Sequence, residues 1–104
     1  MTNEYGAALD SNGYAPSILG AFDFCGICYK KGPIQRHEVF HGSNRKKSKR
    51  FGLWIHVCPA CHHEIHFTDG KLDRVLKQNA QQAAMLYYGW SEEEFRKRFG
   101  KSYV

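Results

Sequence analysis

The sequence predicts a small α+β domain with bound zinc, for three reasons. The chain has 104 residues, which suits one domain but leaves a hydrophobic core marginal without a further staple. All four cysteines and all six histidines fall between residues 22 and 67, and the cysteines form two C-x-x-C pairs. Segments with strand character lie between the pairs, and a segment with helical periodicity follows them.

The first 20 residues predict a flexible N-terminal arm. The segment MTNEYGAALDSNGYAPSILG is rich in Gly, Ser and Asn and has no clear periodicity. We expect this arm (1–20) to precede a metal-binding core (21–68) and a helical extension (69–104). No apolar run approaches the roughly 20 residues of a membrane helix, and no signal-like segment is visible at the start. We therefore expect a cytoplasmic, reducing setting and no membrane partner.

The two cysteine pairs predict a structural zinc site. They read CGIC at Cys25 and Cys28, and CPAC at Cys58 and Cys61. Such turns let two sulfurs meet one zinc ion at about 2.3 Å. The alternatives are two disulfides, which a reducing setting disfavours, a dithiol redox motif, which lacks its βαβ context, and an iron–sulfur cluster, for which this spacing is less usual. We expect a closed zinc site with no room for substrate.

Two strands joined by a basic loop are expected between the cysteine pairs. QRHEVFHG (35–42) predicts a strand with mixed faces, and FGLWIHV (51–57) predicts an aromatic and β-branched strand. The linking run NRKKSKR (44–50) has five basic residues in seven. Alone it indicates a solvated, mobile loop, but beside a metal site it favours contact with phosphate, because Lys and Arg displace counterions from nucleic acid. The formal net charge of +5 agrees with an acidic partner.

The histidines after the second cysteine pair predict another metal site. A helix is expected to begin near residue 60, which places His62 and His66 one turn apart on one face. If the first strand packs on this helix, His37 or Glu38 meets that pair and supplies a further ligand or a general base. Neighbouring strand residues point to opposite faces, so both can serve only if the strand bends. His63 is expected to face away from this pair, and His41 and His56, which have no obvious partner, are surface or phosphate-contact candidates.

The last third of the chain predicts two C-terminal helices. Residues at spacings of three and four draw one mostly apolar stripe: Leu72, Val75, Leu76, Asn79, Ala83, Leu86 and Tyr87. Gly89 is expected to end this helix, and Ser91 with Glu94 predicts a capping box for the next one. The stripe is expected to pack on the core. It can also support a homodimer or a contact with another protein.

The order of these motifs resembles the HNH endonucleases. C-x-x-C is followed by a strand with a histidine and an acidic residue, then by C-x-x-C-H with a further histidine. HEVFHGSNRKKSKRFGLWIHVCPACHH is especially similar to small HNH-type proteins of phages and prophages. The resemblance covers residues 22–67 and implies a treble-clef ββα-metal core with structural zinc at the four cysteines. It also implies hydrolysis of phosphodiester bonds in DNA and, if the chain is phage-encoded, a bacterial host and a phage protein partner.

The resemblance further implies roles for single residues. His62 corresponds to the helix ligand of the catalytic ion, Mg²⁺ or another divalent cation, and His66 to a second helix ligand. The family's strand motif is a metal ligand followed at once by the general-base histidine. Here that dipeptide is His37-Glu38, so either His37 is the base or His37 is the ligand and Glu38 the base. We prefer His37 as base, because imidazole suits water activation near neutral pH. Asn44 is the only candidate for the family's asparagine.

The implied enzyme would hold the DNA backbone through basic side chains, without reading the base sequence. We expect six residues to do so: Arg36, Arg45, Lys46, Lys47, Lys49 and Arg50. The alternative function is a non-catalytic zinc-binding module that binds nucleic acid through the same side chains. A third reading is a structural zinc domain whose C-terminal helices dimerise.

Overall fold

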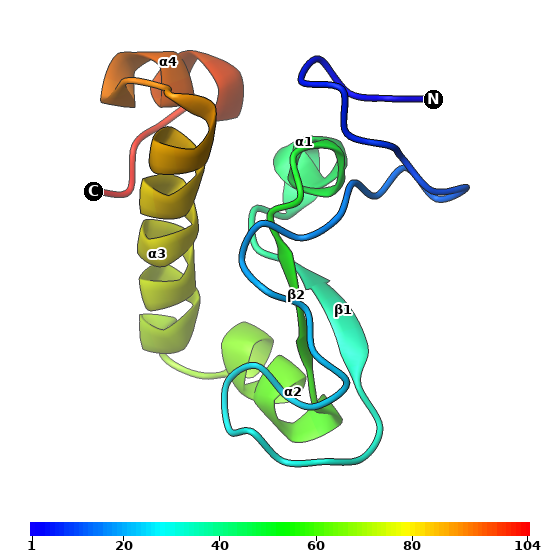
Figure 1. The fold of residues 1–104 in the computed structure, drawn as a ribbon. Helices are drawn as coiled ribbons and strands as arrows, with labels where there is room; N and C mark the ends of the chain where they lie inside the picture. Colours follow the sequence, from blue (N-terminus) through cyan, green and yellow to red (C-terminus); the bar gives the residue numbers. More distant parts are fainter.

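A two-stranded antiparallel sheet and four α-helices make up the fold in a computed structural model that describes residues 1–104 (Figure 1). In chain order the elements are β1 (Gln35–Glu38), the 3-10 helix η1 (Gly42–Asn44), α1 (Arg45–Arg50), β2 (Trp54–Val57), α2 (Pro59–Phe67), α3 (Lys71–Tyr88) and α4 (Glu92–Phe99). The expected α+β class is confirmed. Both strands lie inside the predicted segments but are shorter than these.

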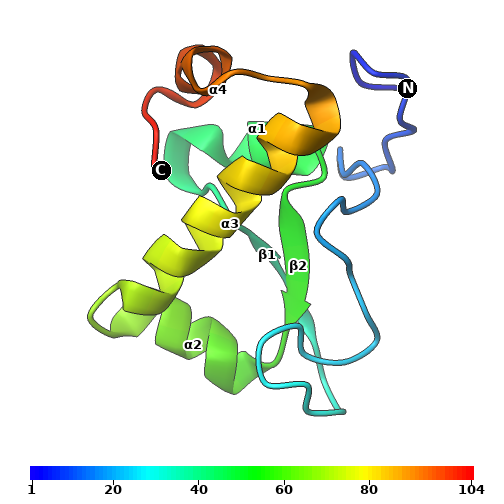
Figure 2. The same ribbon diagram turned by 60° about the vertical axis from the view of Figure 1, so that its left-hand side comes forward.

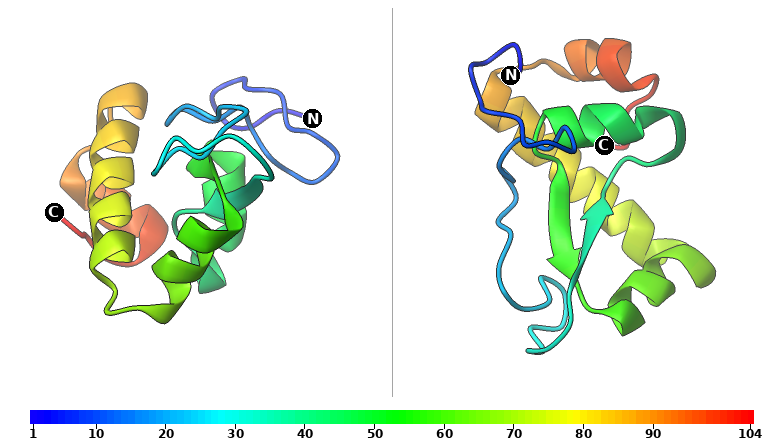
Figure 3. Two further views of the ribbon diagram at one scale, coloured as in Figure 1. Left: turned by 90° about the horizontal axis from the view of Figure 1, so that it is seen from below. Right: turned by 90° about the vertical axis from the view of Figure 1, so that its right-hand side faces the viewer.

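The sheet separates two groups of side chains. In its register His37 lies opposite Ile55 and Glu38 lies opposite Trp54. Because side chains alternate along a strand, His37 and Ile55 share one face while Glu38 and Trp54 share the other. Ile55 packs in a cluster with cysteines and α2, and α3 runs across one side of the strands, in front of them in Figure 2 and behind them in the right-hand view of Figure 3.

The N-terminal segment runs along the free edge of β2 (Figure 3). The Asn3 side chain donates to the Arg50 carbonyl at 2.8 Å, and Trp54 Nε1 donates to the Ala15 carbonyl at 2.8 Å. At Gly52, with φ of 70°, an added Cβ would lie 2.2 Å from the Pro16 carbonyl oxygen. The segment predicted to be a flexible arm therefore makes defined contacts with the core, and its Gly, Asn and Asp residues form turns there.

The basic run is a helix and not a mobile loop. Residues 45–50 form α1, and Ser48 at its centre has no exposed surface. Ser48 Oγ accepts from the Phe40 amide at 2.9 Å and donates to the Phe40 carbonyl at 2.6 Å. These two bonds hold α1 against the end of β1. Lys and Arg have high helix propensities, so this run can form a helix. Its high charge pointed instead to a solvated loop.

The long helix α3 confirms the predicted helix but buries a different face. Ala80 and Ala84 are fully buried in the main hydrophobic cluster, whereas Leu86 is 88% exposed and Tyr87 is 68% exposed. The small alanines let the helix backbone approach the aromatic side chains of the core. The predicted stripe is thus correct near Leu72 and Leu76, which pack on the clusters, and wrong toward its end.

The short helix α4 is tied to α1. Ser91 Oγ accepts from the Glu94 amide at 3.0 Å, which confirms one half of the predicted capping box, while the Glu94 side chain pairs with Arg98. At the other end the Asn44 side chain donates to the Phe99 carbonyl at 2.9 Å, and Lys47 Nζ donates to the Arg98 carbonyl. None of the helices has both the length and the apolar character that crossing a membrane requires.

Candidate metal centres

The four cysteine sulfurs meet at one point and can bind a metal such as zinc. The Sγ atoms of Cys25, Cys28, Cys58 and Cys61 lie within 4.8 Å of one another, and all four thiols are free. The sulfurs of Cys28 and Cys58 are 3.8 Å apart. Zinc–sulfur bonds of about 2.3 Å in a tetrahedron place neighbouring sulfurs about 3.8 Å apart, so the spacing fits. Three of the cysteines are buried, namely Cys25, Cys58 and Cys61, and Cys28 alone is exposed.

Backbone amides help to hold the sulfurs. The amides of Ile27 and Cys28 donate to Cys25 Sγ, each at 3.4 Å, and the Cys61 amide donates to Cys58 Sγ at 3.4 Å. Burial acts to raise the pKa of Cys25, but hydrogen bonds from the backbones of Cys28, Cys58 and Ile27, that of Cys28 foremost, lower it to about 6. Burial and the neighbouring sulfurs raise the pKa of Cys61. A metal ligand is a thiolate, so metal binding here would release protons.

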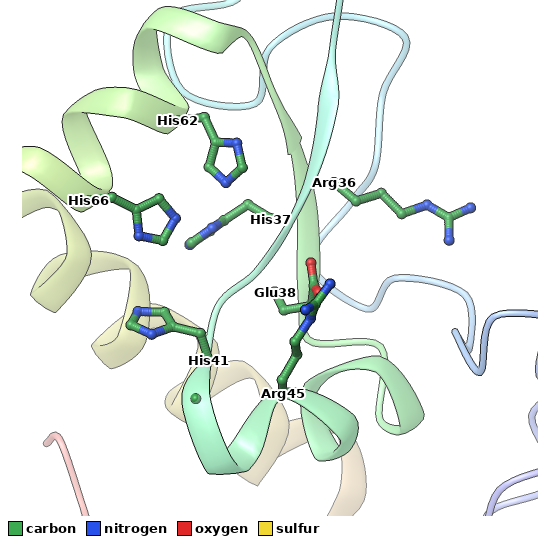
Figure 4. A pocket seen from close by; sticks show the side chains of 8 residues that line it. Arg36, His37, Glu38, His41, Arg45, His62 and His66 are labelled. Atoms are coloured by element: carbon green, nitrogen blue, oxygen red, sulfur yellow. The ribbon is translucent and has the colours of Figure 1, made fainter.

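Three histidines form a second cluster. Ligand atoms of His37, His62 and His66 lie within 4.8 Å of one another. β1 supplies His37, and α2 supplies the other two from positions one turn apart, as the spacing predicted. The ring centroid of His37 lies 5.3 Å from that of His62 and 5.3 Å from that of His66. Figure 4 shows the three rings turned toward a common centre. Such a set can hold one divalent cation.

His37 fits a metal ligand because its ring is buried without a partner. The residue is 2% exposed, and its Nε2 atom has no hydrogen bond. A buried polar atom left unsatisfied costs roughly 1–3 kcal/mol, and a bound cation would satisfy it. Burial, followed by the nearby rings of His62 and His66, lowers the pKa of His37 to about 4. The imidazole is therefore neutral, which is the form that binds metals.

Gln35 orients one of the histidines, and sequence reasoning missed it. The Nδ1 atom of His62 lies 2.7 Å from the side-chain oxygen of Gln35, which can only accept, so Nδ1 carries the proton and donates. That arrangement leaves Nε2 of His62 free to bind a cation. Gln35 and His37 are two apart on β1 and share a face, which is the only signal in the sequence that pointed to this role.

Glu38 faces away from the three histidines. Its carboxylate oxygen lies 2.5 Å from Arg45 Nε, on the other side of β1 (Figure 4). Burial acts to raise the pKa of Glu38, but the hydrogen bond and charge of Arg45 bring that pKa below its usual value. The strand does not bend, so His37 and Glu38 do not share the metal.

A polar pocket of about 430 Å³ nevertheless joins the two sides of β1 at its end. No hydrophobic residue lines it, and its walls carry three histidines of the cluster, one acid and two arginines: Arg36, His37, Glu38, His41, Gly42, Arg45, His62 and His66. A pocket of this composition suits a charged ligand.

The other histidines serve different partners. His41 Nε2 lies 3.3 Å from a carboxylate oxygen of Asp73, a residue of α3 that the sequence did not single out. His56 Nδ1 lies 2.7 Å from the Phe22 carbonyl and donates to it, which fastens the N-terminal segment to β2. His63 is exposed and its ring lies 4.7 Å from that of Phe67. None of these three belongs to the histidine cluster.

Most of the predicted DNA-binding cations already have protein partners. Arg36 pairs with Asp10 at 3.2 Å and lies over the ring of Tyr14 at 4.2 Å. Of four further cations in α1, two form ion pairs and two do not. Arg45 pairs with Glu38 and Arg50 with Glu4, whereas Lys46 and Lys49 form no ion pair. Lys47 and Asn44 cap α4. The Asn44 side chain is therefore engaged by the end of α4.

Comparisons with family models, with curated proteins and with solved structures find no match for this chain. Its function has to be argued from the two ligand clusters. One offers four sulfur ligands, and the other offers nitrogen ligands from three histidines that line an open, charged pocket.

Proposed function

We propose that this chain is a metal-dependent endonuclease of the HNH type that hydrolyses phosphodiester bonds in DNA. The observation that carries the proposal is the convergence of His37, His62 and His66 at the floor of a pocket with two arginines in its walls. Three protein ligands leave coordination positions open for substrate and water, whereas four thiolates close a structural site. The order β1, β2 and α2 with the cysteine cluster agrees with a treble-clef ββα-metal core, which we propose for residues 21–68.

Three imidazoles favour some cations over others. Imidazole suits Zn²⁺, Ni²⁺ and related ions, whereas Mg²⁺ prefers oxygen ligands in an octahedral shell. Mg²⁺, expected from the resemblance, therefore fits this ligand set less well. A divalent cation bound here would polarise the scissile phosphate and stabilise the leaving oxygen.

We assign His37 to the metal and Glu38 to the attacking water, the reverse of the preference from sequence. The buried, unpartnered Nε2 of His37 supports a ligand, and Glu38 lies in the wall of the same pocket. Glu38 takes the proton of the attacking water while the new bond to phosphorus forms and the bond to the leaving oxygen breaks. Arg45, which pairs with Glu38, can bind a non-bridging phosphate oxygen.

Cleavage of supercoiled plasmid tests this proposal. Zinc-loaded protein is incubated with Mn²⁺, Ni²⁺, Zn²⁺ or Mg²⁺, beside the variants His37→Ala, His62→Ala and Glu38→Gln. We expect all three variants to lose cleavage, and the exposed His63→Ala to keep it. Binding of the second metal separates the roles, because it should be lost in His37→Ala and kept in Glu38→Gln. Absence of cleavage with every metal would reject the nuclease.

A second candidate, a zinc-binding module that binds nucleic acid without cutting it, also has support. The Glu38 carboxylate is occupied by Arg45, and Asn44 is occupied by the end of α4. Both contacts reduce the resemblance to an active nuclease. This candidate predicts salt-sensitive retention of DNA in the absence of cleavage, and unchanged retention in His62→Ala.

A further inference from the structure

Helix α1 divides its basic side chains between two pockets. Arg45 lines the pocket above the histidine cluster. Its neighbour Lys46 lines a second pocket of about 440 Å³, which lies between α1 and the N-terminal segment. The lining residues of this second pocket include three cations and no carboxylate: Leu9, Asn12, Gly13, Lys46, Lys49 and Arg50. Its composition favours an anionic ligand.

The charges in this second pocket are only partly compensated. Lys49 and Arg50 follow Lys46 by three and four residues, so each of them lies beside Lys46 on α1, where like charges repel. Arg50 pairs with Glu4, but neither lysine takes part in any ion pair of the structure. Lys49 Nζ lies 4.9 Å from the ring centre of Tyr14. A bound anion would relieve this repulsion.

The wall opposite α1 is held in place by the protein itself. A side-chain oxygen of Asp10 accepts from the Asn12 amide at 2.9 Å and from the Tyr14 amide at 3.0 Å, which fixes the turn between them. The Ala15 amide donates to the Lys49 carbonyl at 2.9 Å, which fixes that turn to α1. The pocket is thus formed before any ligand arrives, and a preformed site spends less free energy on ordering.

We propose that this pocket binds a second backbone phosphate of the nucleic acid whose scissile phosphate lies at the histidine cluster. The proposal deepens the function proposed above and rests on it for the position of the cut. An α-helix is about 10–12 Å across, so a strand that crosses α1 links the two pockets over that span.

Salt-dependent binding of a fluorescent DNA duplex tests the proposal. Binding is measured by anisotropy in zinc-loaded His62→Ala protein, so that neither cleavage nor its absence affects the result. Into this protein we introduce Lys46→Ala and Lys49→Ala, singly and together, with Lys97→Ala as the matched exposed control. We expect each lost phosphate contact to weaken binding about eightfold at 0.1 M salt and to lower the slope of log K against log salt by about 0.9. Arginine at either position should restore both values.

Two outcomes would overturn the proposal. One is a double variant whose affinity and salt slope equal those of Lys97→Ala, at matched thermal stability. The other is displacement of the duplex by millimolar inorganic phosphate, compared with chloride at equal ionic strength, because the pocket would then be a site for free anions. Loss of plasmid cleavage in the wild type, with the expected salt slopes intact, would reject the nuclease and leave the second pocket as a nucleic-acid contact.

Discussion

The neighbouring residues His37 and Glu38 of β1 point to opposite sides of the sheet and have different partners. His37 enters the buried side of the sheet with the other two ligands, while Glu38 turns to Arg45 on the opposite side. Side chains alternate in any strand, so the two residues can act together only where the strand ends and both reach the same pocket. The chemistry of this dipeptide therefore depends on its place at the end of β1.

At this scale we expect Gln35 to control metal affinity at the histidine cluster. Gln35→Ala removes the acceptor that holds Nδ1 of His62, so the ring loses its orientation. Loss of such a partner typically weakens metal binding about 10- to 100-fold. Titration calorimetry with Ni²⁺ on zinc-loaded protein measures this change. The exposed Gln82→Ala is the control, and equal affinities in the two variants would contradict the assigned role.

Ser48 should contribute to stability well beyond its size. Ser48→Ala leaves the buried amide and carbonyl of Phe40 without their partner, at a cost of about 1–3 kcal/mol. Urea unfolding monitored by tryptophan fluorescence gives the free energy. Ser43→Ala, which alters an exposed serine in η1, is expected to change it by less than about 0.5 kcal/mol. A similar value for both variants would show that the two bonds to Phe40 add nothing.

The role of a residue can be predicted from the sequence when its partners are close in the chain, and not when they are distant. Cys25 and Cys28, or His62 and His66, have spacings that local geometry turns directly into ligand sets. For the third member of the histidine cluster, the sequence left a choice between His37 and Glu38, because that position depends on how β1 packs against α2. Asp73 pairs with His41 across 32 residues of chain, and no local pattern indicates such a contact.

At the scale of elements, α3 shows why a helix can be predicted while its buried face is not. Gln81 has no exposed surface, and its side chain binds Ser102 Oγ at 2.9 Å and the Tyr103 amide at 2.6 Å. The buried residue Gln81 is polar, and the exposed residues Leu86 and Tyr87 are hydrophobic. A prediction that places the apolar stripe of a helix on the core therefore selects the wrong face here. The spacing of apolar residues predicts the helix, but its buried face also depends on the C-terminal residues, which contact Gln81.

Enlarging the small residues of α3 should therefore be costly. Ala84→Leu adds a branched side chain at a position with no exposed surface, against the aromatic cluster, and we expect destabilisation of about 1–3 kcal/mol. The shift of the thermal midpoint measures it. The opposite change at an exposed site, Leu86→Ala, should stay within about 0.5 kcal/mol. Tolerance of leucine at position 84 would mean that α3 does not pack closely there.

For the whole molecule, the apolar side chains form two distinct clusters, and Leu19 and Leu76 pack against both of them. The larger surrounds Phe40, Phe51 and Phe95, and the smaller combines the cysteines with Ile55, Val57 and Ile65. The smaller cluster contains few apolar side chains apart from the cysteines. Its stability should therefore depend on the metal that the cysteines bind.

Removal of zinc is expected to unfold the end of the molecule that carries both ligand clusters. Cys58→Ser, or a strong chelator, should lower the unfolding midpoint and also abolish metal binding at the histidines, because β2 and α2 lose their anchor. Circular dichroism and Ni²⁺ titration follow the two effects. His62→Ala should keep zinc and the unfolding midpoint. An unchanged midpoint after zinc has been removed would contradict a structural role for the cysteine cluster.

The contact at Gly52 has a consequence for how the chain is made. Residues 1–20 leave the ribosome before Gly52 does, yet the amide of Ile18 donates to the carbonyl of Gly52, and Pro16 lies against the same residue. At about 5–20 residues per second, the segment waits on the order of seconds for its docking surface. During that interval its apolar residues have no native partner. Nascent chains stalled before and after β2 should therefore differ in how readily a protease cuts residues 1–20.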